Sequence, residues 1–220
     1  KSDYAGGIFS LRSQAIETVR NSTIEDMQGQ RVGTIYDAQG DVIAELKNER
    51  NIRYLTSEEI PQTVKDAFVS IEDKRFYKHN GVDFLALTRA VTKLINKDAI
   101  TQGGSTITQQ LARNVFLTHE VSWQRKVKEM FIAWEIEKMY SKDQILEFYV
   151  NNIFYANNCY GIEAASQKYF GKPTAECSIS EVAFLCAIPN SPSRFDPLDH
   201  KENTLTRRDV ILEAMYENKK

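Results

Sequence analysis

The 220-residue chain is poor in cysteine, which argues against two kinds of cross-linked fold. Its three cysteines, Cys159, Cys177 and Cys186, are odd in number and lack the paired spacing of a zinc site. We expect neither a disulfide framework nor a metal knuckle, and we interpret the three thiols as packing residues. Internal repeats and low-complexity tracts are also missing, so a single domain is expected for a chain of this length.

Long apolar runs and an excess of one charge are missing as well. The longest uncharged apolar run, residues 182–188, is far shorter than the roughly 20 residues that span a bilayer. The chain starts at Lys1 without a signal pattern, so we expect a fragment of a longer protein. A net charge of -2 gives no basic field that would attract nucleic acid. We expect no nucleic-acid partner, and an anionic ligand would have to meet a local basic cluster.

Several catalytic signatures are absent too. The sequence has no His-Glu-x-x-His zinc motif, no nucleotide phosphate loop, no dinucleotide glycine fingerprint and no Gly-x-Ser-x-Gly elbow. It also lacks Ser-x-x-Lys combined with Lys-Thr-Gly, which excludes a penicillin-reactive domain within these residues.

Hydrophobic periodicity predicts a mainly helical chain. Strand patterns at 32–36 and 42–46 flank a turn at Gly40, so residues 1–60 are interpreted as an N-terminal segment with a β-hairpin. From Pro61 a 3.6-residue period begins, and residues 61–220 form the main part of the single domain. Helices are predicted from Pro61 to about Asp73, over 84–97, 122–140, 142–152 and 182–188, and from near Thr204.

A polar run from Gly103 to Arg113 is the first candidate binding segment. Two glycines permit unusual backbone angles, and neutral donors and acceptors of this kind read sugar hydroxyls and phosphate oxygens. The alternative is a glycine turn followed by a Ser/Thr helix cap. The polar members of the run are Ser105, Thr106, Thr108, Gln109, Gln110 and Arg113.

Two carboxylates are candidates for catalysis. Glu72 follows an apolar helix stripe and is surrounded in sequence by cations. In such a setting burial and neighbouring charge together set the proton affinity of a general base. The alternative is an exposed helix end with ion pairs. Glu129 shares a helix with Arg125 and Lys126. The guanidinium of Arg125 and the ammonium of Lys126 are suited to bind a diphosphate. Here the alternative is an ordinary surface pair. His79, beside Asn80-Gly81, is given a structural role.

Five separated segments resemble, in order, the motifs of the peptidoglycan glycosyltransferases, glycosyltransferase family 51, found in class A penicillin-binding proteins and monofunctional relatives. The segments are EDKRFYKHNG at 72–81, GGSTITQQ at 103–110, RKVKE at 125–129, KDQILEFYVN at 142–151 and RRDVIL at 207–212. The resemblance extends from about residue 70 to 215, and it makes residues 61–220 the glycosyltransferase domain.

The resemblance implies a mainly α fold with a lysozyme-like core, a smaller membrane-facing helical lobe and the short N-terminal β-hairpin. The amphipathic segment 84–97 would lie in that lobe, with an apolar stripe opposite Arg89, Lys93 and Lys97. The stripe could enter lipid headgroups or pack in the core, and the two readings stay open.

The implied reaction joins lipid II to a growing glycan strand and releases polyprenyl diphosphate with inversion at the MurNAc anomeric carbon. Glu72 would deprotonate the GlcNAc 4-hydroxyl, and Glu129 would position the cations of the diphosphate site. The resemblance also admits a divalent cation, Mg or Mn, as a further aid. No organic cofactor is implied. The implied substrate-binding residues are Asp73, Phe76, Ser105, Thr106, Gln109, Gln110, Arg113, Arg125, Lys126, Tyr149 and Asn151.

Two positions depart from the family pattern. Arg113 stands where many relatives have Lys, and Val121 stands where they often have a basic residue four positions before Arg125. The second departure puts one expected diphosphate contact in question, because His119 would replace it only when protonated.

The resemblance also implies partners and a location: lipid II, the glycan strand, the membrane surface on the extracytoplasmic face and a transpeptidase domain in the full-length chain. Two other functions remain open from the residues alone. One is a lysozyme-like enzyme that cleaves glycans with two carboxylates. The other is a non-catalytic module that binds lipid II.

Overall fold

A computed structural model describes residues 2–29, 33–36, 42–46, 54–95, 104–117 and 122–220. Its helices and strands, in chain order, are α1 (Ser2–Arg20), α2 (Ile24–Met27), β1 (Gly33–Tyr36), β2 (Val42–Leu46), α3 (Gln62–Glu72), α4 (Phe84–Ile95), α5 (Ile107–Phe116), α6 (Trp123–Met139), α7 (Lys142–Asn152), α8 (Ile162–Phe170), α9 (Ile179–Ala187) and α10 (Lys201–Glu217). Three short 3-10 helices, η1 (Phe76–Lys78), η2 (Thr174–Glu176) and η3 (Ile188–Asn190), connect them. The prediction of a mainly helical chain is confirmed.

Helix starts follow the capping residues of the sequence. The hydroxyls of Ser141 and Ser178 each accept a hydrogen bond from the backbone of the third helical residue, and their own backbone N–H groups donate to the side chain of that residue, which completes a capping box. Ser122 caps α6 through its hydroxyl. These caps satisfy the free N–H groups of the first turn, and the helices predicted over 122–140 and 142–152 are confirmed.

The two strands pair antiparallel, with Gly33 opposite Leu46 and Tyr36 opposite Val42. The predicted turn at Gly40 lies outside the described residues. So do Val121 and His119, and Gly103 of the polar run.

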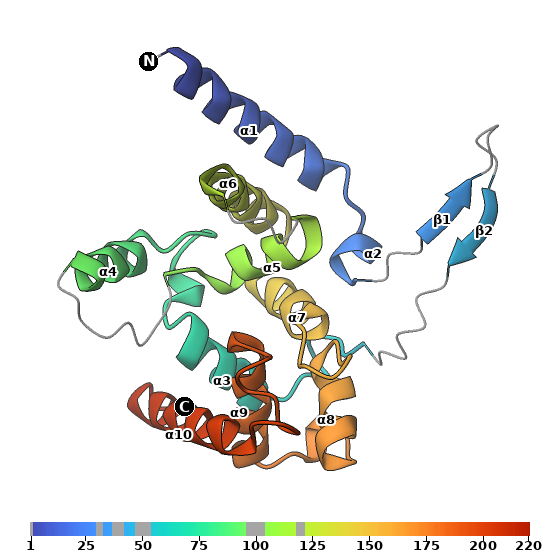
Figure 1. Ribbon diagram of the computed structural model, residues 1–220, viewed down its shortest axis with the longest axis vertical. Helices are drawn as coiled ribbons and strands as arrows, with labels where there is room; N and C mark the ends of the chain where they lie inside the picture. Colours follow the sequence, from blue (N-terminus) through green and yellow to red (C-terminus); the bar gives the residue numbers. More distant parts are fainter. Residues whose placement is uncertain (1, 30–32, 37–41, 47–53, 96–103, 118–121) are drawn as a thin grey trace.

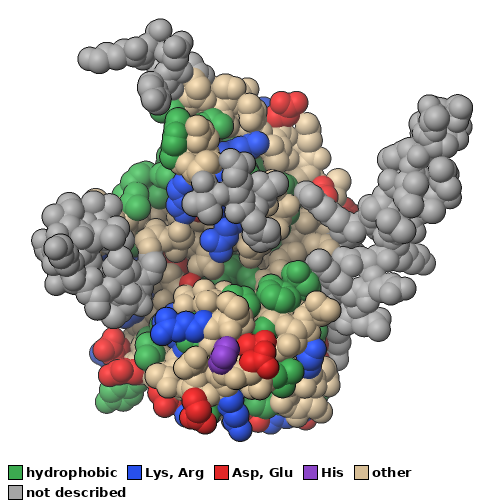
Figure 2. All heavy atoms as spheres, in the orientation of Figure 1, with side chains coloured by type: hydrophobic (Ala, Val, Ile, Leu, Met, Phe, Trp, Pro, Cys, Tyr) green, Lys and Arg blue, Asp and Glu red, His purple; other side chains and the backbone are tan. Residues whose placement is uncertain are grey.

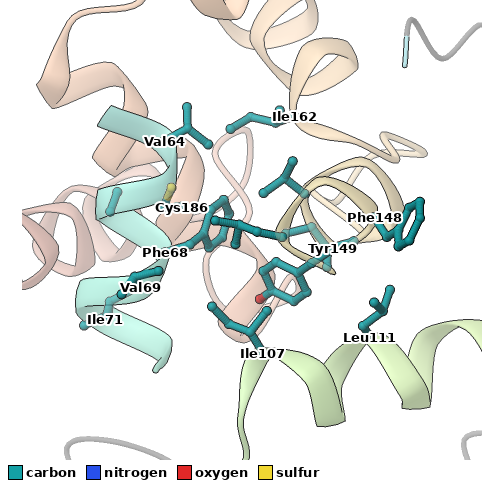
Figure 3. Packing of buried hydrophobic residues seen from close by; sticks show 14 of the residues in the cluster. Val64, Phe68, Val69, Ile71, Ile107, Leu111, Phe148, Tyr149, Ile162 and Cys186 are labelled. Atoms are coloured by element: carbon teal, nitrogen blue, oxygen red, sulfur yellow. The ribbon is translucent and has the colours of Figure 1, made fainter. Parts of the chain in front are cut away.

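One hydrophobic core unites the domain. The core helix α7 packs against α5, α3 packs against α9, and α10 covers both α3 and α9. In Figure 1, α3, α8, α9 and α10 form the lower half of the molecule, and α1, α5 and α6 lie in the upper half. Phe68 of α3 and Tyr149 of α7 are fully buried at the junction, with ring centroids 5.3 Å apart in an edge-on arrangement (Figure 3).

The cysteines behave as predicted. All three are free thiols; Cys159 and Cys186 lie in the core, and Cys177 packs against it. Burial raises the pKa of the Cys186 thiol well above its usual value, with a smaller contribution from the charge of Glu72. A buried thiol of this kind is inert, which fits a packing role.

Part of the predicted amphipathic stripe is open to solvent. Phe84, the first residue of the stripe, is 54% exposed, although its ring also lies 6.2 Å from that of Trp134. Leu85, which is 55% exposed, lies outside the predicted stripe, one helical turn before Arg89. The side chain of Lys93 and residue Lys97 lie outside the described part of the chain. None of the described helices is both long enough and apolar enough to cross a bilayer.

Candidate active site

Glu72 is the last residue of α3, and two other helices meet its carboxylate. Gln110 of α5 donates a hydrogen bond from Nε2 to Oε2 of Glu72 at 2.9 Å. The hydroxyl of Tyr149, on α7, donates in turn to Oε1 of Gln110 at 3.1 Å. In Figure 3 the Tyr149 hydroxyl extends from the core beside Ile107 at the start of α5. The three side chains form one hydrogen-bonded chain from the core to the carboxylate.

The alternative interpretation of Glu72 as an exposed helix end is wrong, although the ion pairs that it expected do form beside it. Its side chain is only 13% exposed, which leaves it accessible but shielded from most water. The neighbouring cations turn elsewhere, because Lys74 pairs with Glu217 and Arg75 pairs with Asp83. A partly shielded carboxylate at a helix end can accept a proton from a ligand that reaches it.

Asp73 fixes the position of that helix end. Both of its oxygens lie within 3.0 Å of Nε2 of His79, and its Oδ2 accepts a hydrogen bond from the backbone N–H of Ile107 at 3.1 Å. Asp73 is buried, so the prediction that it binds substrate is corrected: its carboxylate is used to tie α3 to the first residue of α5. The structural role predicted for His79 is confirmed.

Thr106 and Gln109 cap helix α5. Thr106 accepts a hydrogen bond from the backbone of Gln109, and the Gln109 side chain accepts one from the backbone of Thr106. The Thr106 hydroxyl also donates to the carbonyl oxygen of Gly81 at 2.5 Å. Both side chains are 2% exposed, so they are structural and do not line a cleft. The helix-cap alternative is correct for these two residues, because the cap satisfies their polar groups internally.

A buried carboxylate organises the second half of the site. Glu129 of α6 is 1% exposed, and it accepts hydrogen bonds from Nη1 of Arg125 at 3.3 Å and Nε2 of Gln109 at 3.4 Å. Lys126 forms a close ion pair with the same carboxylate. The interpretation of Arg125 and Glu129 as an ordinary surface pair is therefore wrong.

The cluster of Arg125, Lys126 and Glu129 carries one more positive than negative charge. The two cations are partly exposed, at 18% and 38%, whereas the carboxylate is not. Lys126 also donates from Nζ to the hydroxyl of Ser105 at 2.7 Å, which joins the cluster to the polar run. Within the described residues, Nε of Arg125 is buried without a hydrogen-bond partner. The arrangement leaves positive charge and donors available for an anion.

Arg113 is the third cation of the site. It lies three residues after Gln110 on α5, so the two side chains share a helix face. It forms no hydrogen bond or ion pair with any residue that the structure describes. Its charge is close enough to lower the pKa of Tyr149, against the larger raising effects of burial and of Glu72. Among the residues that the structure describes, Arg113 is therefore an uncommitted cation near the Glu72 end of the site.

Three other predicted binding residues are buried in the core. Phe76 is fully buried, with the Lys142 ammonium 4.5 Å from its ring centroid. Asn151 exchanges hydrogen bonds with the backbone of Leu55 at 3.0 and 2.8 Å. Tyr149 is 1% exposed and reaches the site only through Gln110. The prediction that these three side chains contact the substrate directly is therefore corrected: they support the structure around the site.

The described residues do not fit a resident divalent cation. They contain no group of three or more His, Cys, Asp or Glu side chains arranged to hold a metal. The oxygens of Glu129 are already met by Arg125, Lys126 and Gln109. A requirement for Mg or Mn stays a prediction.

The sequence did not single out Arg207 of α10 as a site residue. Its Nη2 lies 3.9 Å from Oε1 of Glu72. The fifth motif contains this residue, but two adjacent arginines gave no signal for which of them faces inward. Arg208 instead pairs with the neighbouring Asp209 at 2.7 Å.

A pocket elsewhere on the molecule is lined by Arg208 but by neither Glu72 nor any member of the Glu129 cluster. It has a volume of about 370 Å³, lies between α8, α9 and α10, and has a largely apolar lining that includes Phe170, Phe184 and Leu205. Its carboxylate, Glu181, is paired with Lys172 at 2.8 Å. The chemistry-bearing residues therefore gather around Glu72 and Glu129. In Figure 2, basic side chains appear near the middle of the face shown, where the molecule is hollowed between its upper and lower halves.

Comparison with known proteins gives a consistent result. The family model described as Transglycosylase matches residues 39–216. The chain is 46% identical over 181 residues to penicillin-binding protein 1F of Bacillus subtilis (strain 168), covering 82% of this chain and 25% of that protein. It is 39% identical over 197 residues to penicillin-binding protein 4 of the same organism, covering 89% of this chain and 32% of that protein.

Two further similarities extend the set. The chain is 41% identical over 214 residues to penicillin-binding protein 1A of Escherichia coli (strain K12), covering 97% of this chain and 25% of that protein. A solved structure, penicillin-binding protein 1A from Haemophilus influenzae, matches with a TM-score of 0.43 and 24% identity, covering 86% of this chain and 19% of that one. The chain thus spans a quarter to a third of the length of these curated relatives.

Proposed function

The chain belongs to the transglycosylase family, and on that premise we propose that it polymerises lipid II into peptidoglycan glycan strands. The observation that carries the proposal is the pairing of two unlike sites. One is a shielded carboxylate, Glu72, held by Gln110; the other is the net positive cluster around Glu129. A reaction that removes a proton from a sugar and expels a diphosphate needs both.

Glu72 acts as the general base in the proposed reaction. It takes the proton from the 4-hydroxyl of the acceptor GlcNAc as that oxygen attacks the anomeric carbon of the donor MurNAc. The bond from that carbon to the diphosphate breaks on the opposite face, so the configuration inverts and polyprenyl diphosphate leaves. General-base assistance of this kind contributes about 100-fold to 10,000-fold in rate.

Arg113, Arg125 and Lys126 stabilise the charge on the leaving diphosphate. Guanidinium and ammonium groups aimed at developing charge lower the barrier more than they strengthen ground-state binding. Glu129 is a positioning residue, because it is buried and holds Arg125 and Lys126 together against their mutual repulsion. Ser105 and Gln110 are the partly exposed polar residues of the run that remain suited to contact the sugar.

The state of Glu129 argues against a glycan-cleaving enzyme. Hydrolysis with inversion uses a second carboxylate to activate water, and hydrolysis with retention uses it as a nucleophile. Glu129 is buried and accepts bonds from Arg125, Lys126 and Gln109, so it is poorly suited to either role.

Exposed apolar side chains support a location at the membrane surface. Phe9 of α1, Phe84 and Leu85 of α4, and Trp123 at the start of α6 are each about half exposed or more. Side chains of this kind enter the headgroup region while the polar face stays in water. The proposed location is the extracytoplasmic face of the cell membrane, where the polyprenyl tail of the substrate stays in the bilayer. We also propose that the full-length chain carries a transpeptidase domain.

Incubation with fluorescently labelled lipid II tests the proposal. We expect glycan strands of many disaccharide units, released from a gel as a ladder by a muramidase. Shortening of finished peptidoglycan without polymerisation would support the hydrolase instead. Saturable binding of lipid II with no product, under conditions in which a known polymerase is active, would support the non-catalytic module.

A further inference from the structure

We infer that Arg207 of α10 is a positioning residue that keeps the Glu72 carboxylate charged and leaves its Oε1 free to take the substrate proton. The inference rests on the proposed function, because it assigns a role within that reaction. Glu72 and Arg207 are 135 positions apart in the chain, and only the packing of α10 on α3 brings them together.

The two carboxylate oxygens of Glu72 have different surroundings. Oε2 accepts a hydrogen bond from Gln110 at 2.9 Å. Oε1 faces Nη2 of Arg207 at 3.9 Å, a separation that gives charge attraction without a hydrogen bond. The contacts on the two sides restrain rotation of the carboxylate, and Oε1 keeps its lone pairs. Oε1 is therefore the atom that accepts the proton.

Arg207 is suited to this role because it is shielded and pairs with no other carboxylate among the described residues. Its side chain is 16% exposed, and its Nε has no hydrogen-bond partner within the described part of the chain. A guanidinium near a carboxylate in such a setting is weakly screened by water and salt. The adjacent Arg208 differs, since it is bound to Asp209 through both Nε and Nη2.

The other charged or titratable groups around Glu72 leave Arg207 as a principal counter-charge. Asp73 is bound to His79, and Lys74 is paired with Glu217. On the inner side, burial and then the charge of Glu72 raise the pKa values of Tyr149 and Cys186, so both stay neutral. Arg113 is the other nearby cation, and it is assigned to the diphosphate.

The test compares pH–rate profiles of polymerisation for the wild type, Arg207→Gln and Arg207→Lys. Loss of the cation disfavours the carboxylate anion, so we expect the acidic limb of the Arg207→Gln profile to move up by about one pH unit. The rate should recover as the pH rises above the new limb. Arg207→Lys keeps the charge and should retain the wild-type limb. Arg208→Gln is the matched control, and its limb should not move.

Two further measurements keep the outcomes distinct. Urea unfolding of each variant reports stability, and the carboxyl carbon signal of Glu72, assigned with Glu72→Gln and followed by NMR against pH, reports titration without activity. A lower rate at every pH with an unmoved limb and an unmoved NMR midpoint would make Arg207 merely structural and overturn the inference. If the wild type polymerises nothing but Arg207→Gln still moves the NMR midpoint, the proposed function fails while the electrostatic role of Arg207 stands. If Arg207→Gln does not fold, an NMR midpoint in Arg207→Lys that differs from the wild type by a full pH unit would also overturn it.

Discussion

The ammonium of Lys126 lies 2.7 Å from the hydroxyl of Ser105. This contact joins α6 to the residues that precede α5, so the polar run and the basic cluster form one continuous surface. Further along α5, Gln110 donates a hydrogen bond to the Glu72 carboxylate at 2.9 Å. A single helix, α5, thus connects the proposed base to the proposed diphosphate site.

Replacement of the buried Glu129 tests the organisation of the cluster. Glu129→Gln leaves Arg125 and Lys126 without a counter-charge, so we expect a loss of about 1–3 kcal/mol in the free energy of unfolding. The loss stays moderate because both cations can turn toward water. Urea unfolding measures it. Glu135→Gln, which removes a pair with the exposed Lys138 on the same helix, should cost about 0.5 kcal/mol; equal costs for the two variants would contradict a buried, organising role.

Gly81 holds α6 close to the segment before α4. Its φ is +88°, and a Cβ there would lie 2.8 Å from the backbone of Ala133. Gly81→Ala is expected to cost about 1–3 kcal/mol from backbone strain, with the clash in addition. Gly171→Ala is the control, since Gly171 also has a positive φ of +66° but meets no atom within 4 Å. Thermal unfolding should show the larger loss for Gly81→Ala, and the reverse order would refute the close approach.

The Lys172–Glu181 pair predicts a pH-dependent stability. The Lys172 ammonium, with the Ser178 N–H and hydroxyl, lowers the pKa of Glu181 from 4.5 to about 2. Because the folded pKa lies below the unfolded one, the stabilisation is complete above about pH 5 and is lost as the pH falls to 2. The difference in unfolding midpoint between wild type and Glu181→Gln should shrink over that range. A Glu181→Gln difference that stays constant between pH 5 and pH 2 would exclude the linkage.

The two hydrogen bonds that link Tyr149 to Gln110 and Gln110 to Glu72 predict that loss of Gln110 lowers both the stability and the polymerisation rate. Gln110→Leu removes both hydrogen bonds and leaves the buried Tyr149 hydroxyl unpaired. We expect a cost of about 1–3 kcal/mol in unfolding free energy. The polymerisation rate should fall by about tenfold to a hundredfold, because Glu72 loses its fixed orientation. Asn114→Leu, at an exposed position of the same helix, should change neither quantity by a comparable amount.

Much of the helical framework could be predicted from the sequence because its signals are local. Capping boxes at Ser141 and Ser178 mark helix starts, and Pro61 is the residue before α3. Helix α8 was not predicted: its nine residues between Gly161 and Gly171 are too short for a clear 3.6-residue period. The last helix begins at Lys201, three residues before the predicted start near Thr204. The prediction is late because the first turn of the helix carries no apolar signal.

The site could be predicted only in part. Residue types and spacing indicated Glu72 and the basic cluster, but they did not separate polar groups that face a ligand from those that hold the fold. Thr106 and Gln109 illustrate the difficulty, because a T-x-x-Q pattern fits both a sugar-binding run and a capping box. Burial of Phe76 and the approach of Arg207 to Glu72 depend on tertiary packing, which no local pattern encodes.

The rate of lipid II polymerisation by Glu72→Gln tests the central claim most directly. The variant keeps the size of the side chain and its capacity to bond Gln110, so its urea unfolding curve should stay close to that of the wild type. If Glu72 is the general base, the polymerisation rate of Glu72→Gln should be at least about 100-fold lower than that of the wild type at every pH. A folded Glu72→Gln enzyme that elongates glycan strands at the wild-type rate would contradict the account.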